Sequence, residues 1–310
     1  MSTFKLFSGS ANPEFATKVA EYLGMNVSNA TLNKFSDGEI SVQITESVRG
    51  QDVFIIQPTC APANDNLMEL LIMVDALKRS SAKSISAVIP YYGYARQDRK
   101  AAPRVPITAK LVADILETAG ISRVVTVDLH AAQIQGFFNI PADNLFGSIL
   151  FANYIKSKNL KNPIIASPDI GGVARARSYA DKLGYDLIIV DKKREKANMS
   201  EVMNIIGDVK GKDVILVDDM IDTAGTIVKA AEVLKKKGAN SVMACCTHGV
   251  LSGPAYDRIE KGELDELVIS DTIPTQLNAK KITILTASTM IGEAIRRIHN
   301  NESVNSIFIG

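Results

Sequence analysis

The residues with the clearest potential for chemistry lie in the stretch VDDMIDTAGT, at residues 217–226. Two adjacent carboxylates, Asp218 and Asp219, close the apolar run 214–217, and small residues lead into helical periodicity over residues 227–237. A strand, a turn and a helix expose backbone N–H groups and the positive end of a helix dipole, which together bind phosphate. Carboxylates beside a phosphate suit sugar hydroxyls or Mg²⁺. An ordinary acidic strand end with a threonine cap is the alternative.

Two other stretches combine residue types that bind nucleotides. FSDGE at residues 35–39 holds an aromatic ring, two carboxylates and a turn glycine, which suit an adenine base, but a surface turn before a strand at 40–44 has the same composition. YARQDRK at residues 94–100 follows the apolar run 85–92. Its guanidinium groups match phosphate geometry, although a solvated charged face is equally compatible with it.

Two possible metal or phosphate ligands each follow an apolar run. His130, one of three histidines, stands in DLHAAQIQGFF after the run 124–128. Asp169 stands in SPDIGG, between the run 163–166 and a helix expected from Val173. Ligands bind at the carboxyl ends of strands in open α/β sheets, but a lone histidine is also compatible with a structural role.

A basic cluster follows the expected strand 187–190 and precedes VMNIIG, an expected return strand. A basic loop between two strands can close over a polyphosphate, neutralise developing charge and exclude water. An exposed hairpin tip is the alternative. The cluster consists of Lys192, Lys193, Arg194 and Lys196.

These stretches together resemble the ribose-phosphate pyrophosphokinase (PRPP synthetase) family. The 217–226 loop is also similar to that of type I phosphoribosyltransferases. The stretches at 35–39, 94–100 and 128–138 favour the PRPP synthetase family. The resemblance runs from about Ser8 to the C-terminus. It implies transfer of the diphosphoryl group of MgATP to the C1 hydroxyl of ribose 5-phosphate, giving 5-phosphoribosyl 1-diphosphate (PRPP) and AMP. That product supplies purine, pyrimidine, NAD, histidine and tryptophan synthesis.

The resemblance also implies a role for individual residues. Lys192 would be the catalytic lysine, and Arg194 would assist it on the phosphates and contact ribose 5-phosphate. His130 and Asp169 would hold Mg²⁺. The ATP site, which Phe35, Asp37 and Glu39 would reach from a neighbouring subunit, would comprise Phe35, Asp37, Gly38, Glu39, Arg96, Gln97, Arg99 and His130. The ribose-5-phosphate site would comprise Asp218, Asp219, Asp222, Thr223, Ala224, Gly225 and Thr226.

Assembly and regulation are implied in the same way. The phosphate-regulated class of this family forms hexamers, is activated by phosphate and is inhibited by ADP at a subunit interface, which here would involve Ser47 and Arg49. Some positions depart from the family pattern: Glu195 and Lys196 in KKREKAN, the less polar AAPRV at 101–105, Asn139, and Ala142. None of them is a residue assigned to chemistry.

The elements that must position these residues predict an α/β fold. Strand-length apolar runs alternate with helical periodicity, which is typical of parallel sheets covered by helices. We expect the first helix to be capped by Asn12, to begin at Pro13 and to end at Gly24, with an apolar stripe between its ends. Another amphipathic helix spans residues 67–77.

The chain also repeats itself. VRGQDVFIIQP at residues 48–58 matches VKGKDVILVDD at residues 209–219 at an offset of 161. Leu23-Gly24 matches Leu183-Gly184 at an offset of 160, and Leu77-Lys78 matches Leu234-Lys235 at 157. We therefore expect two duplicated type I phosphoribosyltransferase-like domains, each a mainly parallel sheet flanked by helices. Their expected bounds are residues 1–148 with about 290–310, and residues 149–289.

Only the second copy is expected to hold ribose phosphate. After its strand the first copy reads QPTCAPANDN, with no acidic pair and no loop of small residues. The first copy is therefore expected to serve in ATP contacts and assembly.

Composition excludes several other classes. The 310 residues include 35 Lys and Arg against 34 Asp and Glu, so the net charge gives no electrostatic attraction to nucleic acid or to an acidic membrane. No GxxxxGK[ST] occurs, so a P-loop does not hold the nucleotide. The three cysteines, Cys60, Cys245 and Cys246, are too few for a disulfide framework or a zinc site. No targeting or membrane-spanning segment is evident, and a cytoplasmic protein is expected.

Two rival functions fit part of this pattern. A nucleobase phosphoribosyltransferase shares the 217–226 loop but consumes PRPP, and neither the duplication nor FSDGE is needed for that activity. A catalytically inactive, regulatory relative of PRPP synthetase is the other rival. The presence of Lys192, Arg194, His130 and Asp169 argues against it.

Overall fold

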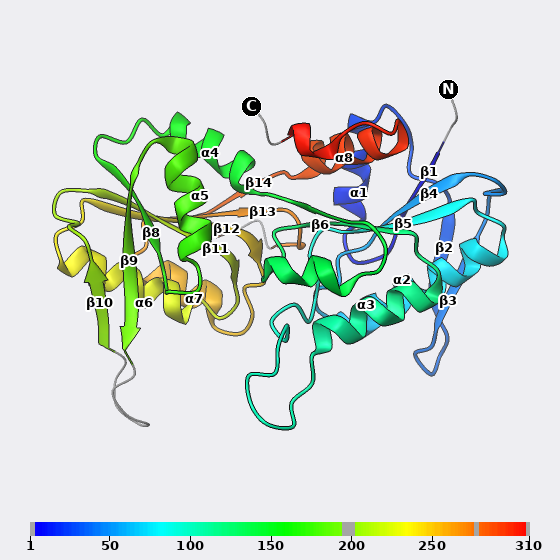
Figure 1. The fold of residues 1–310 in the computed structure, drawn as a ribbon, viewed down its shortest axis with the longest axis horizontal. Helices are drawn as coiled ribbons and strands as arrows, with labels where there is room; N and C mark the ends of the chain where they lie inside the picture. Colours follow the sequence, from blue (N-terminus) through cyan, green and yellow to red (C-terminus); the bar gives the residue numbers. More distant parts are fainter. Residues whose placement is uncertain (1–3, 194–201, 276–278, 308–310) are drawn as a thin grey trace. The chain divides into compact units, whose positions relative to one another are not determined.

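The computed structural model describes residues 4–193, 202–275 and 279–307. The chain forms two compact units, each with its own sheet (Figure 1). Unit 1 comprises Met1–Phe146, Thr272–Pro274 and Thr286–Gly310, and unit 2 comprises Gly147–Asp271 and Thr275–Leu285. None of the helices in the described part of the chain combines the length and the apolar character that a bilayer crossing requires.

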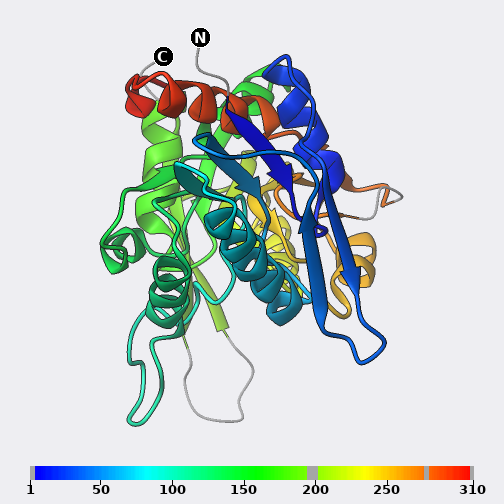
Figure 2. The ribbon, with the colours of Figure 1, turned by 90° about the vertical axis from the view of Figure 1, so that its right-hand side faces the viewer.

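Unit 1 contains a five-stranded sheet in the order β1-β4-β5-β6-β7, in which every neighbouring pair is parallel. A separate antiparallel hairpin, β2–β3, forms a two-stranded ribbon (Figure 2). The strands are β1 Lys5–Ser8, β2 Ala30–Lys34, β3 Ile40–Ile44, β4 Asp52–Ile56, β5 Ser84–Ile89, β6 Arg123–Val127 and β7 Ala142–Leu145. The helices are α1 Pro13–Tyr22, α2 Ala63–Arg79, α3 Thr108–Ala119 and α8 Ser288–His299, with 3₁₀ turns η1 Ala132–Phe137 and η2 Val304–Ile307.

Unit 2 contains a seven-stranded sheet in the order β10-β9-β8-β11-β12-β13-β14, which is parallel except for the edge strand β10. The strands are β8 Pro163–Ser167, β9 Asp186–Lys193, β10 Val202–Ile206, β11 Asp213–Ile221, β12 Ser241–Gly249, β13 Glu266–Ser270 and β14 Ile282–Leu285. The helices are α4 Ser148–Ser157, α5 Val173–Leu183, α6 Gly225–Lys236 and α7 Ala255–Lys261.

Helices cover both faces of the unit 2 sheet. Leu216 of β11 belongs to a core cluster with residues of α6 and α7, whereas Val217 belongs to a second cluster with residues of α4 and α5. Because neighbouring strand residues point to opposite faces, two such clusters require a helical layer on each side. The expected fold class, a mainly parallel sheet flanked by helices in each half, is confirmed.

Matching hydrogen bonds show the duplication directly. Before β4, the N–H of Gly50 donates to the carbonyl oxygen of Ser81 at 2.9 Å, and before β11 the N–H of Gly211 donates to that of Gly238 at 2.8 Å. Gly50 and Gly211 have φ angles of 70° and 69°, in the left-handed region that favours glycine. The same turn therefore introduces β4 in unit 1 and β11 in unit 2.

The first residues of β4 and β11 are also held alike. Asp52 accepts a hydrogen bond from the hydroxyl of Ser84, and Asp213 accepts one from Ser241, both at 2.7 Å. Each pair is in register between neighbouring parallel strands. The two copies therefore share local contacts as well as sequence.

The first helix begins as its sequence predicts. The side chain of Asn12 accepts a hydrogen bond from the N–H of Phe15 at 3.3 Å, and Pro13 occupies the first helical position. Gly24, with a φ of 67°, follows the helix end.

Two strand ends differ from the expectation. The strand expected at 214–217 continues to Ile221, because Met220 and Ile221 pair with the long neighbouring strand β12. Correspondingly, helix α6 begins at Gly225, two residues earlier than expected. The strand expected at 187–190 continues to Lys193 by pairing with β10. The apolar run 85–92 is only partly a strand, because β5 ends at Ile89.

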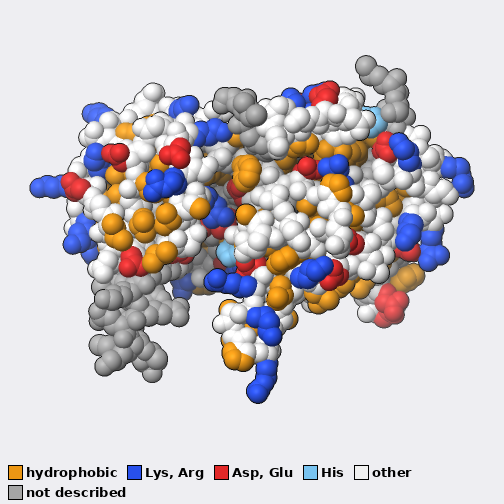
Figure 3. All heavy atoms as spheres, viewed as in Figure 1, with side chains coloured by type: hydrophobic (Ala, Val, Ile, Leu, Met, Phe, Trp, Pro, Cys, Tyr) orange, Lys and Arg blue, Asp and Glu red, His pale blue; other side chains and the backbone are white. Residues whose placement is uncertain are grey.

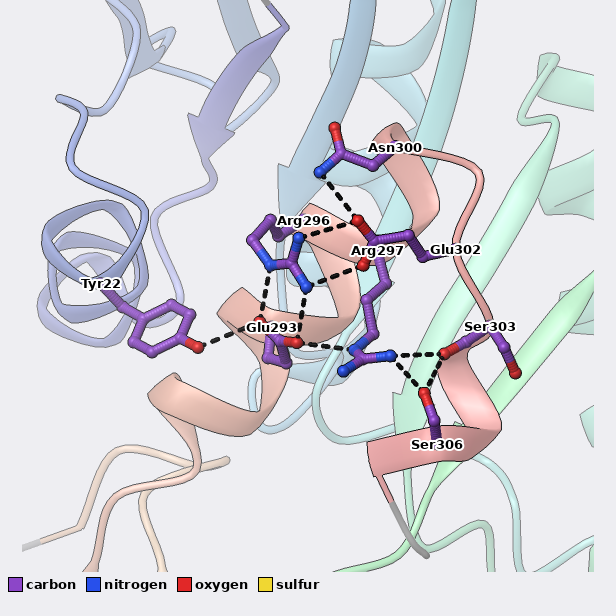
Figure 4. A network of polar contacts seen from close by, with 8 residues as sticks. All are labelled: Tyr22, Glu293, Arg296, Arg297, Asn300, Glu302, Ser303 and Ser306. Atoms are coloured by element: carbon purple, nitrogen blue, oxygen red, sulfur yellow. Dashed lines mark hydrogen bonds and ion pairs between the residues drawn. The ribbon is translucent and has the colours of Figure 1, made fainter.

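Charged side chains fasten α8 to α1 within unit 1 (Figure 4). Glu293 of α8 accepts hydrogen bonds from Tyr22 at 3.1 Å, from Arg296 at 2.8 Å and from Arg297 at 2.6 Å. These bonds, those from Arg296 foremost, lower the pKa of Glu293 to about 2. Arg296 also pairs with Glu302, beyond the helix end, at 2.8 Å. The C-terminal segment is thereby fixed to unit 1.

Asp213 anchors the start of β11 and is itself buried. Its carboxylate accepts hydrogen bonds from the backbone N–H groups of Lys161 and Asn162 at 3.1 and 3.3 Å, from the Asn240 amide at 2.6 Å and from the Ser241 hydroxyl. Burial opposes ionisation, but these hydrogen bonds outweigh it and lower the pKa of Asp213.

We expect Asp213→Asn to lower the free energy of unfolding by about 1 to 3 kcal/mol at neutral pH, because the new amide group would face four donors. Since the pKa of Asp213 is lower in the folded state, its contribution is present above the unfolded pKa and is lost as the pH falls through the folded value. The difference from the native protein should therefore shrink in acid, as measured by urea unfolding followed by circular dichroism.

Asp208→Asn is the control, since Asp208 is exposed and accepts from the N–H of Lys210 at 3.0 Å. Its effect should stay within about 0.5 kcal/mol. A difference for Asp213→Asn that grows in acid would contradict the assignment.

Candidate active site

The loop between β11 and α6 has the geometry of an anion site. Three residues, 222–224, connect the strand to the helix, and Ala224 has a φ of 58° in the left-handed region. That conformation costs a non-glycine residue about 1 to 2 kcal/mol, so the surrounding structure must impose it. No side chain caps the helix at its start. The dipole of α6 therefore favours an anion such as phosphate at this loop.

Residues that follow β12 brace this loop from one side. The N–H of Ser252 donates to the carbonyl oxygen of Asp222 at 3.0 Å, and the Ser252 hydroxyl contacts the Asp222 carboxylate. Nη1 of Arg258, on α7, donates to the carbonyl oxygen of Thr223 at 2.9 Å. A Cβ on Gly225 would lie 3.2 Å from the same guanidinium nitrogen, so this glycine allows the close approach.

The acidic pair lies in the part of β11 that pairs with β12 but no longer with β8. Pairing with β8 ends at Leu216, whereas pairing with β12 continues to Ile221. Asp218 and Asp219 therefore flank an open edge of the sheet on the β8 side. The expectation that the pair terminates the strand is wrong, but the pair still lies at the carboxyl end of the neighbouring strand β8.

Arg175, on α5, contacts both carboxylates. Its Nη1 lies 3.0 Å from Oδ1 of Asp219 and 3.5 Å from Oδ1 of Asp218. The Asp219 side chain is 3% exposed and that of Asp218 is 26% exposed. Burial first, then the charge of Asp219 and a hydrogen bond with it, raise the pKa of Asp218, and the charge of Arg175 opposes the shift.

Asp169 begins the loop between β8 and α5. Its Oδ1 accepts a hydrogen bond from the N–H of Gly172 at 2.9 Å, and its carbonyl oxygen accepts one from the buried Ser167 hydroxyl at 2.6 Å. A Cβ on Gly172 would lie 2.9 Å from that hydroxyl oxygen, so the tight turn requires glycine. This loop, like the acidic pair, lies at the carboxyl ends of the parallel strands of unit 2.

The basic cluster lies only partly within the described residues. Lys192 and Lys193 belong to β9 and pair with Met203 and Val202 of β10, so the return strand is confirmed. The side chain of Lys192, and the whole of Arg194 and Lys196, lie outside what the structure describes.

In unit 1, the loops of two predicted nucleotide stretches meet. The side-chain amide of Gln133, from the stretch 128–138, donates to Asp98, from the stretch 94–100, at 2.6 Å. Gln97 accepts from the hydroxyl of Thr108, the first residue of α3, and its carbonyl oxygen accepts from the N–H of Ala109 at 3.1 Å. A nucleotide bound to Gln97 would therefore compete with these two contacts to the start of α3.

Basic side chains are exposed on the loop between β5 and α3, which projects from unit 1 (Figure 3). Arg96, Arg99 and Lys100 lie on it, followed by Arg104. A cationic loop on a helix-covered sheet suits a polyphosphate.

His130 is exposed three residues after β6. The chain leaves the strand through Asp128, whose φ of 42° is left-handed. Asn144 of β7 accepts from the N–H of Leu129 at 3.0 Å and so fixes this bend. His130 is thus presented on a fixed loop, as a ligand would be.

FSDGE forms the tip of the β2–β3 hairpin (Figure 2). The N–H of Phe35 donates to the carbonyl oxygen of Glu39 at 2.8 Å, and that of Gly38 donates to Phe35 at 2.9 Å. Gly38 has a φ of 95°, which its missing side chain permits. The Phe35 ring is 59% exposed and is free to cover a flat ligand.

The first copy lacks an anion site at the corresponding place. There the buried carboxylate of Glu69, on α2, accepts from the N–H of Ser10 at 2.6 Å and from Gln57 at 2.8 Å. A neighbouring pocket of about 210 Å³ is lined by Asp65 as well as Glu69, together with Lys34. Carboxylates repel phosphate, which agrees with a degenerate first copy.

Sequence reasoning missed Arg175 and Arg258. Each contacts the 217–226 stretch from another part of unit 2, and no local motif distinguishes either one. One sequence signal could have identified Arg175: it is a cation in the first turn of a helix, where acidic residues are preferred.

Known proteins resemble this chain over its whole length. Residues 4–120 match the N-terminal domain of ribose phosphate pyrophosphokinase, and residues 194–309 match the phosphoribosyl synthetase-associated domain. The ribose-phosphate pyrophosphokinases of Wolinella succinogenes and Campylobacter jejuni are 71% and 70% identical, over 100% of this chain and 100% of each relative. A crystal structure of phosphoribosylpyrophosphate synthetase from Mycobacterium smegmatis is 44% identical, with a TM-score of 0.92, covering 97% of this chain and 100% of that one.

A duplicated α/β fold, with a short loop between β11 and α6 and an acidic pair beside it, is typical of a phosphoribosyltransferase-like enzyme. Within that class, the chain belongs to the ribose-phosphate pyrophosphokinase family. The predicted family is therefore confirmed, and the protein is an enzyme of that family.

Proposed function

We propose that this enzyme transfers the β,γ-diphosphoryl group of ATP to the C1 hydroxyl of ribose 5-phosphate. The C1 oxygen attacks the β-phosphorus, the bond from that phosphorus to the bridging oxygen of the α-phosphate breaks, and AMP leaves. The hydroxyl proton passes to solvent. The observation that carries the proposal is the uncapped start of α6 beside the acidic pair Asp218 and Asp219, in a chain of this family.

The pentose site belongs to unit 2. The 5-phosphate would lie against the N–H groups of residues 223–226, where the helix dipole favours an anion. The carboxylates of Asp218 and Asp219 would accept hydrogen bonds from ribose hydroxyls. Because the loop is braced by Ser252 and Arg258, little ordering remains to oppose binding.

Lys192 and Arg194 would neutralise charge on the transferring group. Phosphoryl transfer passes through a loose transition state, so positioning and charge stabilisation supply most of the catalysis and a strong base is not needed. A hairpin such as β9–β10 can bring these cations to the phosphates and exclude water.

The ATP residues belong to unit 1: Phe35, Asp37, Gly38 and Glu39 on the hairpin tip, and Arg96, Gln97, Arg99 and His130 on the two loops that meet through Gln133 and Asp98. An exposed aromatic ring, guanidinium groups and an imidazole match a base and its phosphates. We propose that the hairpin tip serves a neighbouring subunit of a hexamer.

The residues present fit Mg²⁺ delivered with ATP. Within the described residues, no three His, Cys, Asp or Glu side chains gather as a metal cage. Mg²⁺ commonly binds through one or two protein ligands and substrate phosphates, so His130 and Asp169 suffice as protein ligands. When bound, Mg²⁺ supplies charge neutralisation to the phosphate oxygens.

Phosphate as activator and ADP as inhibitor are the proposed effectors. Arg49 donates to the hydroxyl of Ser81 at 3.1 Å on the exposed turn before β4, close in sequence to Ser47. A guanidinium and two hydroxyls suit an anion. We also propose a cytoplasmic location, supported by three buried cysteines that remain free thiols.

Incubation with ATP, Mg²⁺ and ribose 5-phosphate should yield AMP and PRPP in equal amounts, measured by ³¹P NMR. Formation of ADP would indicate transfer of a single phosphoryl group. Consumption of PRPP with a nucleobase, without synthesis from ATP, would support a nucleobase phosphoribosyltransferase. Absence of all products from a folded sample that binds ATP would support an inactive regulatory subunit.

Asp218→Asn should weaken the binding of ribose 5-phosphate and leave ATP binding unchanged, because the carboxylate acts only in the pentose site. Loss of one charged hydrogen-bond partner corresponds to about tenfold or more in affinity. Isothermal titration with each ligand separately measures both. Equal losses for the two ligands would show that the sites are not divided between the copies.

Subunit sharing can be tested by mixing two variants. Glu39→Ala and Lys192→Ala should each be nearly inactive alone, the latter by about 10² to 10³ in kcat from one lost contact to the transition state. After protomer exchange, about a quarter of the sites would combine both intact parts, and activity should recover to that level. If native mass spectrometry shows mixed oligomers and activity stays at the parental level, FSDGE serves its own subunit.

A further inference from the structure

Arg175 has no role in the reaction described above, yet it contacts the two carboxylates of the pentose site. The single nitrogen Nη1 is 3.0 Å from Asp219 and 3.5 Å from Asp218. One cation is therefore shared by two anions, and the charge of the trio is close to −1 when both carboxylates are ionised.

Helix α5 offers no local reason for a cation at this position. Arg175 lies in the first turn of the helix, where the dipole disfavours positive charge. No acidic residue in that turn compensates for it. Its side chain is only 20% exposed, whereas Arg177, on the same helix, is exposed. The position of Arg175 is explained by the carboxylates it faces.

The acidic pair needs such a cation. Asp219 is nearly fully buried, and the two carboxylates converge on the same guanidinium nitrogen, at 3.0 and 3.5 Å. The backbone N–H of Asp219 also donates to Oδ1 of Asp218 at 2.9 Å. Cys246 of β12 pairs in register with Asp218, and burial raises the pKa of its thiol, so this neighbour is neutral. The charge of Arg175, which lies within 3.5 Å of both carboxylates, offsets the repulsion between them.

We propose that Arg175 is a positioning residue of the pentose site: it holds Asp218 and Asp219 convergent and ionised, so that both accept hydrogen bonds from the hydroxyls of ribose 5-phosphate. This inference rests on the proposed function. A protonated carboxyl group would donate a hydrogen bond, and an unpaired carboxylate would rotate away from its neighbour. Either change removes acceptors that the sugar needs.

Isothermal titration with ribose 5-phosphate and with ATP, each alone, tests the inference on three variants. Arg175→Gln should bind ribose 5-phosphate about tenfold more weakly or worse, with ATP affinity unchanged within about twofold. Arg175→Lys keeps the charge without the planar fork and should recover part of the loss. Arg177→Gln removes an exposed cation from the same helix and should bind both ligands as the native protein does.

A double-mutant cycle separates action through the carboxylates from direct contact with the substrate. The variants are Arg175→Gln, Asp219→Asn and the two combined. If Arg175 acts through the pair, the combined loss in ribose-5-phosphate affinity will be clearly smaller than the product of the single losses, because the cation has less charge to balance. Fully multiplicative losses would overturn the inference. So would an Arg175→Gln protein that loses both ligands equally and unfolds at lower temperature.

Failure of this inference can be told apart from failure of the proposed function. If Asp218→Asn binds ribose 5-phosphate as well as the native protein, the pentose-site assignment itself is wrong. If Asp218→Asn weakens binding while Arg175→Gln retains native affinity, the pentose site stands and the role of Arg175 is refuted.

Discussion

The constraint on which unit 2 depends is the burial of two like charges side by side in its central strand. Asp218 and Asp219 repel each other, and burial strengthens that repulsion because it removes the water that would screen it. Pairing of β11 with β8 stops at Leu216, just before the pair, and Arg175 contacts both carboxylates there. The acidic site thus lies where β8 ends and β11 continues.

The comparison of the two copies shows how one fold can carry different sites. Both use the same glycine turn and the same aspartate, at the start of β4 in one copy and of β11 in the other. They diverge at the opposite end of these strands, where the first copy places Glu69 against the N–H of Ser10 and the second places the acidic pair beside the short loop 222–224. Stability contacts are thus kept at the amino ends of the strands, and chemistry varies at the carboxyl ends.

The sequence predicted the fold class, the repeat and the first helix because these depend on local periodicity and on turns that need glycine. It missed the ends of β11 and β9 because the length of a strand depends on its neighbours: Met220 has a partner in β12, and Lys192 has one in β10. It missed Arg175 because a contact between α5 and β11 joins segments about 40 residues apart without a local motif.

The duplication also relates two loops that have no sequence similarity. The hairpin β2–β3 follows α1 in unit 1, and the strands β9 and β10 follow α5 in unit 2, so FSDGE and the segment that joins β9 to β10 have equivalent places in the chain. The first hairpin stands apart from its sheet, whereas β9 and β10 join the sheet of unit 2 through β8. A hairpin that is separate from its sheet can present its tip to another molecule. This difference in pairing supports the proposal that FSDGE serves a neighbouring subunit.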